Sequence, residues 1–208
     1  CFFAIFVVMR RQQFKDYSNI LRHLSMFRLW NLMVLRFSFV VTKMRKKPFH
    51  RGLPFALSIE PTTACNLACP ACPSGLKSFT RPTGKLDLNE HEQWLTQVRK
   101  SVFYINYYFQ GEPFLHPQFL DLVKSAKKHR IYTATSTNAH FIDQQKAKAI
   151  VESGLDRLII SIDGLTQETY ESYRVNGQLD KVITGSKHLV EAKKAANSAT
   201  PFLIFQFL

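Results

Sequence analysis

Three of the four cysteines lie within eight residues, at a spacing that suits a metal centre. Cys65, Cys69 and Cys72 form a C-x3-C-x2-C pattern. Cysteines this close do not easily close unstrained disulfides, and three of them leave one thiol unpaired. Pro70 and Pro73 keep the segment out of a regular helix. We therefore expect a loop that folds back on itself and points three sulfurs at one centre.

The spacing alone leaves the identity of the metal open. Structural zinc takes four ligands, usually two C-x2-C pairs or one pair with two histidines, and no second pair follows here. Cubane iron–sulfur clusters normally take four cysteines as well. Three cysteines leave one iron open, which suits a cluster that binds a substrate. The alternative is a closed four-thiolate site completed by Cys1, in a non-catalytic iron–sulfur or zinc protein.

The chain after residue 54 alternates between strand-like and helix-like stretches. The expected strands are 55–60, 104–109, 131–135, 157–162 and a fifth from about 202. The expected helices are about 88–98, 117–129, 143–152, 166–173 and 179–196. This alternation predicts an α/β fold with a parallel sheet and right-handed crossovers. An open Rossmann-like sheet and a closed or partial barrel both satisfy it, although no G-x-G-x-x-G follows the first strand.

Each of the first four expected strands is followed at once by a polar or metal-binding group. The three cysteines follow the first strand. The later groups are Gln110-Gly111-Glu112-Pro113, Ser136-Thr137-Asn138 and Ser161-Ile162-Asp163-Gly164. Because the carboxyl ends of parallel strands carry the chemistry of such folds, we expect the four groups to converge on one mouth. Taken singly, the Gly-Glu-Pro stretch is an ordinary turn and Ser136 with Asn138 a helix cap.

Taken together, these motifs resemble the radical S-adenosylmethionine (SAM) superfamily. The combination of C-x3-C-x2-C, Q-G-E-P, S-T-N, S-I-D-G-x5-Y and Y-R-V-N-G is similar to the branch with a cysteine-rich SPASM or twitch extension. The resemblance covers the chain from about residue 55 and implies a partial parallel (β/α)6 barrel, reached here up to its fifth strand. Two departures are Gln110, in place of the first glycine of G-G-E-P, and Ala71, where many members have an aromatic residue.

The resemblance implies an enzyme. Its three cysteines would hold a [4Fe-4S] cluster that cleaves SAM reductively to a 5′-deoxyadenosyl radical, which takes hydrogen from a substrate such as a peptide or protein side chain. An external one-electron donor such as flavodoxin or ferredoxin is implied, and oxygen-labile thiolates imply the cytoplasm. The implied SAM-binding residues are Gln110, Gly111, Glu112, Pro113, Ser136, Asn138, Ser161, Asp163 and Arg174. The alternative role for Arg174 is a surface salt bridge.

The N-terminal quarter is strongly basic. The whole chain has 28 basic and 15 acidic residues, and residues 1–50 contain ten basic residues against Asp16 alone. We expect a basic arm at 1–53 before a core at 54–208. An amphipathic helix is expected over 14–36, with its apolar positions at Ile20, Leu24, Phe27, Trp30 and Val34.

Three interpretations of this arm follow from its pattern. The helix packs on the barrel with a solvated face, or it attaches to an anionic membrane surface through its basic face and Trp30. Binding of nucleic acid by residues 10–47 is the third, and it is disfavoured because the excess charge is confined to the arm.

The two ends of the chain are also informative. The apolar run at the start is shorter than the ~20 residues of a membrane span, and its basic pair follows it, unlike that of a signal peptide. We expect Met9 to be the native start, with residues 1–8 as upstream reading frame. The last residues stop inside an expected strand, so we expect further sequence beyond them.

Overall fold

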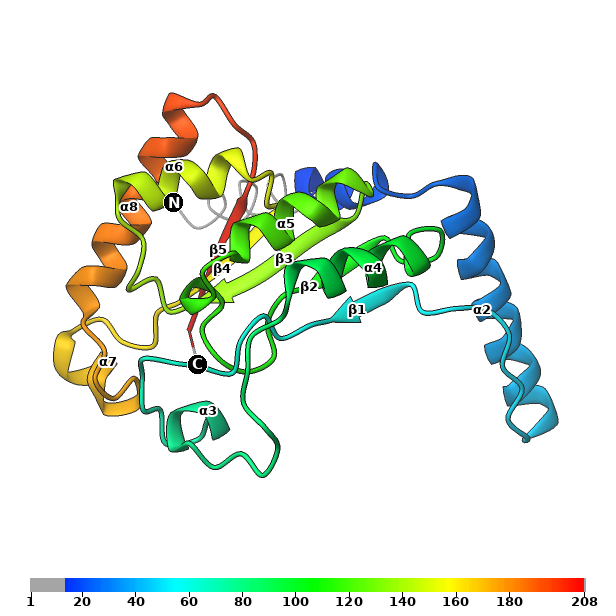
Figure 1. Cartoon of the computed structure of the whole chain (residues 1–208), viewed down its shortest axis with the longest axis horizontal. Coiled ribbons are helices and arrows are strands. Elements are labelled where there is room, and N and C mark those ends of the chain that lie inside the picture. The colour runs from blue at the N-terminus through cyan, green and yellow to red at the C-terminus, as the bar shows by residue number, and fades with distance from the viewer. Residues whose placement is uncertain (1–13, 208) are drawn as a thin grey trace, which may run out of the picture.

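The computed structural model describes residues 14–207, and its centre is one parallel sheet (Figure 1). The strands are β1 (Ala56–Ser58), β2 (Tyr104–Asn106), β3 (Tyr132–Thr137), β4 (Arg157–Ser161) and β5 (Phe202–Gln206). They lie in the order β1-β2-β3-β4-β5, and every neighbouring pair is parallel. This order has no reversal point, which distinguishes part of a barrel from an open doubly wound sheet. The predicted partial barrel is confirmed.

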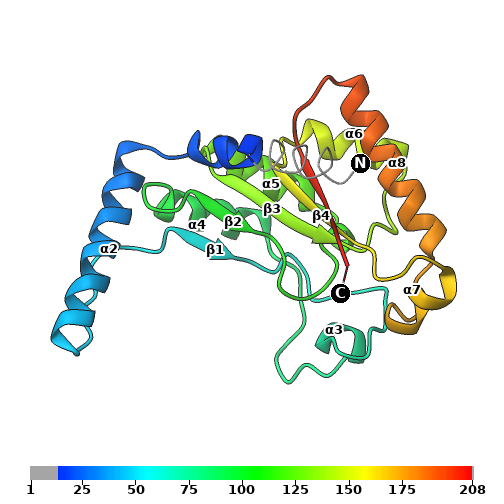
Figure 2. The same ribbon diagram turned by 180° about the vertical axis from the view of Figure 1, so that it is seen from behind.

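The helices follow their strands in the predicted alternation. They are α2 (Met26–Arg45), α3 (Pro73–Leu76), α4 (Leu88–Val98), α5 (Phe119–Lys128), α6 (Gln144–Glu152), α7 (Gln167–Tyr173) and α8 (Leu179–Ala195), with a 3-10 turn at Pro113–Leu115. Side chains of Asp87, Asp143 and Thr166 cap the amino ends of α4, α6 and α7. Figures 1 and 2 show α4, α5, α6 and α8 along one face of the sheet.

The core lies between the sheet and this helical layer. Ile105, Leu122, Ile150 and Leu158 are among its fully buried side chains, and they come from alternating strands and helices. Burial of this apolar surface is the main force that holds the helices on the sheet. The loops at the carboxyl ends of the strands are thereby fixed at one end of the molecule.

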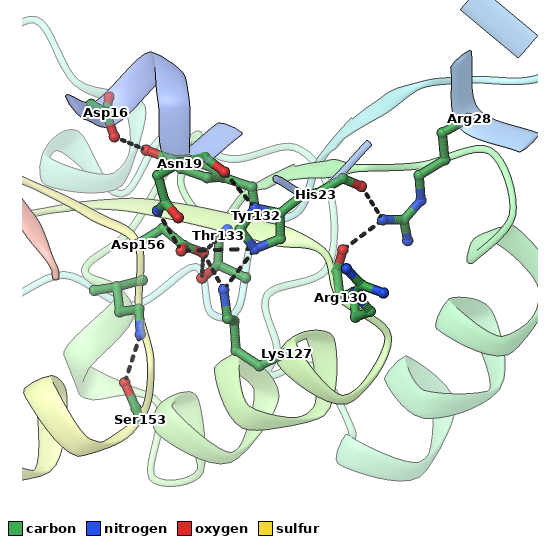
Figure 3. A network of polar contacts seen from close by, with 11 residues as sticks. Asp16, Asn19, His23, Arg28, Lys127, Arg130, Tyr132, Thr133, Ser153 and Asp156 are labelled. Atoms are coloured by element: carbon green, nitrogen blue, oxygen red, sulfur yellow. Dashed lines mark hydrogen bonds and ion pairs between the residues drawn. The ribbon is translucent and has the colours of Figure 1, made fainter. Parts of the chain in front are cut away.

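The predicted single helix over 14–36 is wrong in its bounds. A short helix, Phe14–Leu21, is followed by α2, and the two are bent by 102°. Ser25 starts α2, with its hydroxyl accepting a hydrogen bond from the backbone N–H of Arg28 at 3.4 Å. The buried guanidinium of Arg28 then donates to main-chain carbonyl oxygens at 2.5–3.1 Å (Figure 3). These carbonyls belong to His23, Arg99, His129 and Arg130.

The short helix is held against the amino ends of β3 and β4 by buried acidic groups. Asp16 accepts a hydrogen bond from the hydroxyl of Tyr132 at 2.5 Å and forms an ion pair with Arg157. Asp156 accepts from Asn19 at 2.9 Å and from Lys127 at 2.7 Å (Figure 3). The arm is therefore joined to the sheet at the end opposite to the strand-end loops.

The apolar face of α2 points away from the body. Phe27 and Trp30 are 67% and 64% exposed, whereas the buried residues of this helix are Arg28, Asn31 and Ser38. The reason is that the chain beneath α2 presents main-chain donors and acceptors, which only polar side chains can satisfy. The expected packing of the apolar positions on the barrel is therefore wrong for Phe27 and Trp30. The boundary between arm and core at residues 53 and 54 stays a prediction.

Candidate functional site

The cysteine loop connects β1 to α3 and contains three free thiols. Cys69 is buried, whereas Cys65 and Cys72 are half-buried. The loop reverses through a hydrogen bond from the Cys72 N–H to the Cys69 carbonyl at 3.2 Å. Pro73 then occupies the first turn of the short helix α3, a position at which proline is tolerated. Cys1, the alternative fourth ligand, lies outside the described residues, as do Met9 and the rest of residues 1–13.

The three thiols belong to one loop but point to no common centre. Among residues 14–207, no group of three or more His, Cys, Asp or Glu side chains is arranged to hold a metal ion. Burial raises the pKa of the Cys65 thiol, and burial also raises the pKa of Cys69, against the opposing charge of Arg174. Metal binding must therefore displace protons. Three free thiols on one loop suit a soft metal or an iron–sulfur cluster, so the donor chemistry fits.

The Q-G-E-P turn after β2 lies against this loop. The side-chain oxygen of Gln110 accepts from the Cys72 thiol at 3.3 Å and from the Ser74 hydroxyl at 3.1 Å. The Gly111 N–H donates to the same hydroxyl at 2.9 Å. Gly111 has φ +78°, and a β-carbon there would lie 2.1 Å from the Thr62 carbonyl oxygen. Only glycine permits this approach.

Glu112 joins the turn to two other loops. Its buried carboxylate accepts from the Phe114 N–H at 3.2 Å, the Thr137 hydroxyl at 2.8 Å and the Asn138 N–H at 2.8 Å. Its own N–H donates to the Ala64 carbonyl at 2.8 Å. Burial raises the pKa of Glu112 to about 7 despite these hydrogen bonds. In this structure Glu112 positions the strand-end loops, and Pro113 beside it is buried.

The groups after β3 and β4 meet one another and the cysteine loop. The Asn138 amide donates to the side-chain oxygen of Asn66 at 2.8 Å, and the hydroxyls of Ser136 and Ser161 are 3.4 Å apart. Asn66 is a site residue that sequence reasoning missed. Its only signal was its place between Cys65 and Cys69.

Arg174 brings a positive charge to the cysteines. It forms an ion pair with Asp163, and its Nη1 lies 3.9 Å from the sulfur of Cys69. The turn that follows is tied to the cysteine loop, because the Ala68 N–H donates to the Val175 carbonyl at 3.0 Å. A guanidinium in this position suits a carboxylate or a cluster of thiolates.

Tyr170 is a second residue to which sequence reasoning gave no role. It is the tyrosine of S-I-D-G-x5-Y, it is fully buried, and its hydroxyl has no hydrogen-bond partner among the described residues. Burial raises its pKa to about 12. A β-carbon at Gly177 would lie 2.6 Å from the ring, and one at Gly164 would lie 2.2 Å from the Tyr170 nitrogen. Gly177 thus makes room for the Tyr170 ring, and Gly164 makes room for the backbone of α7 at the same residue.

The structure therefore brings all the predicted groups to one end of the sheet. A pocket of about 490 Å³ borders this region beside Cys65 and Ser74. Its lining does not include Ser136, Asn138 or Arg174. The arrangement offers soft ligands, hydroxyls, an amide and one guanidinium within a connected set of loops.

Comparisons with known proteins agree with this geometry. The family model of the radical SAM superfamily matches residues 59–205. Mycofactocin maturase MftC of Mycobacterium tuberculosis (strain CDC 1551 / Oshkosh) is 34% identical over 147 residues, which cover 69% of this chain and 37% of that protein. PqqA peptide cyclase of Gluconobacter oxydans (strain 621H) is 28% identical over 124 residues, covering 60% of this chain and 34% of that protein. The chain thus spans little more than a third of these relatives.

The fold is similar to that of solved structures. Streptococcus suis SuiB bound to S-adenosylmethionine matches with a TM-score of 0.59 and 20% identity, over 76% of this chain and 35% of SuiB. SuiB bound to precursor peptide SuiA matches with the same TM-score, over 34% of its chain.

Proposed function

The chain belongs to the radical SAM superfamily, and we propose that it forms the core of an enzyme that binds a [4Fe-4S] cluster through Cys65, Cys69 and Cys72. When cluster and SAM are bound, one electron cleaves SAM to methionine and a 5′-deoxyadenosyl radical, which abstracts hydrogen from a substrate. The observation that carries this proposal is the loop of three free thiols, hydrogen-bonded to the loops that follow β2 and β3 and to the turn after α7.

The remaining residues of the mouth are proposed to bind and orient SAM. Backbone carbonyls near Gly111 would accept hydrogen bonds from the SAM amino group. Ser136 and Asn138 offer hydroxyl and amide groups for the ribose or the carboxylate. Arg174 would form an ion pair with the SAM carboxylate, because a guanidinium can donate two parallel hydrogen bonds to a carboxylate. The supporting contacts would come from Gln110, Glu112, Pro113, Ser161 and Asp163.

The proposed substrate is a peptide or a protein side chain. The support comes from two relatives, a mycofactocin maturase and a PqqA peptide cyclase, and from the SuiB structure with a precursor peptide. We further propose a donor of the flavodoxin or ferredoxin class. The free thiols suit a reducing compartment, which favours the cytoplasm.

Anaerobic reconstitution tests the proposal. The protein is loaded with iron and sulfide and reduced with dithionite, its electron paramagnetic resonance spectrum is recorded before and after SAM is added, and 5′-deoxyadenosine is assayed. We expect a SAM-dependent spectral change and product from wild type and from Cys1→Ser, and neither from Cys69→Ala. A cluster that is lost in Cys1→Ser would identify a closed four-thiolate site instead. An electron paramagnetic resonance spectrum of the cluster that does not change when SAM is added would contradict the proposed cofactor binding.

A further inference from the structure

Among residues 14–207, helix α2 carries an exposed apolar stripe along its length. The stripe residues recur at intervals of four and three, which places them on one side of the helix. They are Met26, Trp30, Met33, Phe37, Val40 and Met44. Their exposed fractions run from 39% at Val40 to 79% at Met26. Figures 1 and 2 show α2 at the edge of the molecule, where a flat surface can reach it.

The opposite side of α2 is already occupied, so the helix cannot turn its stripe inward. Three polar side chains on this side each donate one hydrogen bond to the backbone of a residue in the segment 49–53 and accept one from the same residue, at 2.8–3.1 Å. They are Asn31, Ser38 and Thr42. Arg28 is held by the carbonyls at the amino ends of the strands. Rotation of α2 would leave these polar groups buried without partners, at a large cost.

The charge around the stripe selects the class of partner. No acidic residue occurs between Asp16 and Glu60. The basic residues in that interval are Arg22, Arg28, Arg36, Lys43, Arg45, Lys46, Lys47 and Arg51. Arg36 and Lys43 are seven residues apart and so flank the stripe on one side. A second copy of this helix would bring cations against cations, whereas an anionic surface is attracted.

From these observations we propose that α2 lies in the plane of an anionic lipid surface, with its stripe in the acyl boundary and its basic residues at the headgroups. An exposed apolar face with tryptophan and flanking lysine and arginine is the pattern of interfacial helices. Among residues 14–207 no single helix has the length and hydropathy of a membrane span. Phe14–Leu21 and α2 reach that length and hydropathy only when they are taken together, and they are bent by 102° where they meet. The polar contacts of α2 with the body favour the in-plane arrangement.

This placement leaves the proposed catalytic end of the molecule free. Arg28 contacts the chain just before β2 and β3, at the amino ends of the strands. The cysteine loop follows β1, at the carboxyl end. A molecule attached through α2 therefore keeps its strand-end loops away from that contact. The docking surface is independent of the cluster, and its test requires no loaded enzyme.

Flotation with lipid vesicles tests the proposal on the whole chain without cofactors. Vesicles of phosphatidylcholine are compared with vesicles in which part of this lipid is replaced by phosphatidylglycerol. We expect flotation with the anionic vesicles, weakened by salt. Trp30→Glu should lower the bound fraction about tenfold, because a carboxylate would enter the acyl boundary. The matched control is Trp94→Glu, at the only other tryptophan, which is 45% exposed on α4.

Two further measurements make the result decisive. In the Trp94→Phe background, the emission of Trp30 should shift to the blue when anionic vesicles are added. Circular dichroism should show Trp30→Glu to be as folded as wild type. Equal flotation of Trp30→Glu and wild type would overturn the proposal, and so would equal binding to neutral vesicles. A concentration-dependent dimer that Trp30→Glu abolishes would also overturn it, by assigning the stripe to contact between copies.

Discussion

Gly75 and Gly111 hold the cysteine loop in place because neither position has room for a β-carbon. A β-carbon at Gly75 would lie 2.6 Å from the Cys69 nitrogen, and one at Gly111 would lie 2.1 Å from the Thr62 carbonyl oxygen. Backbone therefore packs on backbone around the thiols. The polar contacts of Gln110 and Ser74 with this loop depend on that close approach.

Gly111→Ala is expected to destabilise the fold. Gly111 has a positive φ, and the new methyl group would overlap the Thr62 carbonyl, so the free energy of unfolding should fall by more than about 2 kcal/mol. Gly84→Ala is the matched control, because nothing lies within 4 Å of its β-carbon position. Urea unfolding measures both variants. Equal midpoints for the two would refute the steric argument.

His91 gives the fold a pH dependence of known sign. It is fully buried, its Nε2 lies 2.7 Å from the Tyr107 hydroxyl, and its Nδ1 has no partner among the described residues. Protonation would bury an N–H without an acceptor. Burial thus lowers the pKa of His91 from 6.5 to about 4. A lowered histidine pKa contributes stability that is complete above pH 6.5 and is lost as the pH falls toward 4.

The contribution of His91 should amount to about 3 kcal/mol across that window. The effect of Glu112 on the free energy of unfolding has the opposite pH dependence. Its raised pKa stabilises the folded state fully below pH 4.5, and this contribution is lost as the pH rises through about 7. Wild type and His91→Phe must therefore be compared at each pH. We expect the difference in their free energy of unfolding to change between pH 7 and pH 4. A constant difference for His91→Phe would contradict the prediction.

At the scale of elements, α2 is an inverted amphipathic helix. Its buried residues are the polar Arg28, Asn31 and Ser38, whereas the apolar stripe from Met26 to Met44 is exposed. The inversion follows from what lies beneath, since the segment 49–53 and the carbonyls before β2 and β3 present unsatisfied main-chain groups to it. A helix in this position must place hydrogen-bonding side chains against those main-chain groups, because burying them beneath apolar side chains would leave them without partners.

Arg28→Lys should detach the start of α2. The guanidinium makes five hydrogen bonds to four carbonyl oxygens, and an ammonium group has three donors and a different geometry. We expect a loss of about 2–4 kcal/mol in the free energy of unfolding. Faster proteolysis should appear near residues 22–25. Arg36→Lys, an exposed change on the same helix, is the control, and a similar loss there would remove the special role of Arg28.

At the scale of the whole molecule, the two ends of the sheet carry different tasks. The amino ends hold the arm through Arg28, Asp16 and Asp156 (Figure 3). The carboxyl ends hold the four polar groups, three of which are joined through Glu112 and Asn138. The fourth contacts them through the hydroxyls of Ser136 and Ser161. The sheet keeps the two sets of contacts apart.

Cluster assembly should therefore order the carboxyl end as a unit. Hydrogen exchange is compared between protein without metal and protein reconstituted with iron and sulfide. We expect residues 61–78, 110–113, 136–140 and 173–177 to gain protection together, because hydrogen bonds link these segments. Cys69→Ala should show no gain, and residues 127–133 serve as the internal reference. Protection confined to residues 61–78 would show that the loops are not coupled.

The sequence by itself determined the parallel α/β alternation, the three thiols and the position of each polar group after a strand. These follow from local rules, namely the periodicity of apolar residues, the turn residues and the order of the chain. The family resemblance added the barrel. Local rules could not separate a barrel from an open sheet, since the order of strands is a non-local property that the sequential pairing β1 to β5 decided.

The tertiary structure decided what each polar side chain contacts. Asn66 and Ser74 carried no distinctive signal, because their partners lie far away in the sequence. Tyr170 belongs to the S-I-D-G-x5-Y motif, but the motif did not predict that its side chain is fully buried. Periodicity identified the arm as amphipathic but wrongly placed Phe27 and Trp30 on the inward face. A helical pattern shows that two faces differ, and only the groups beneath the helix decide which of them is buried. Here main-chain carbonyls and amides lie beneath α2, so its polar face is buried and its apolar stripe stays outside.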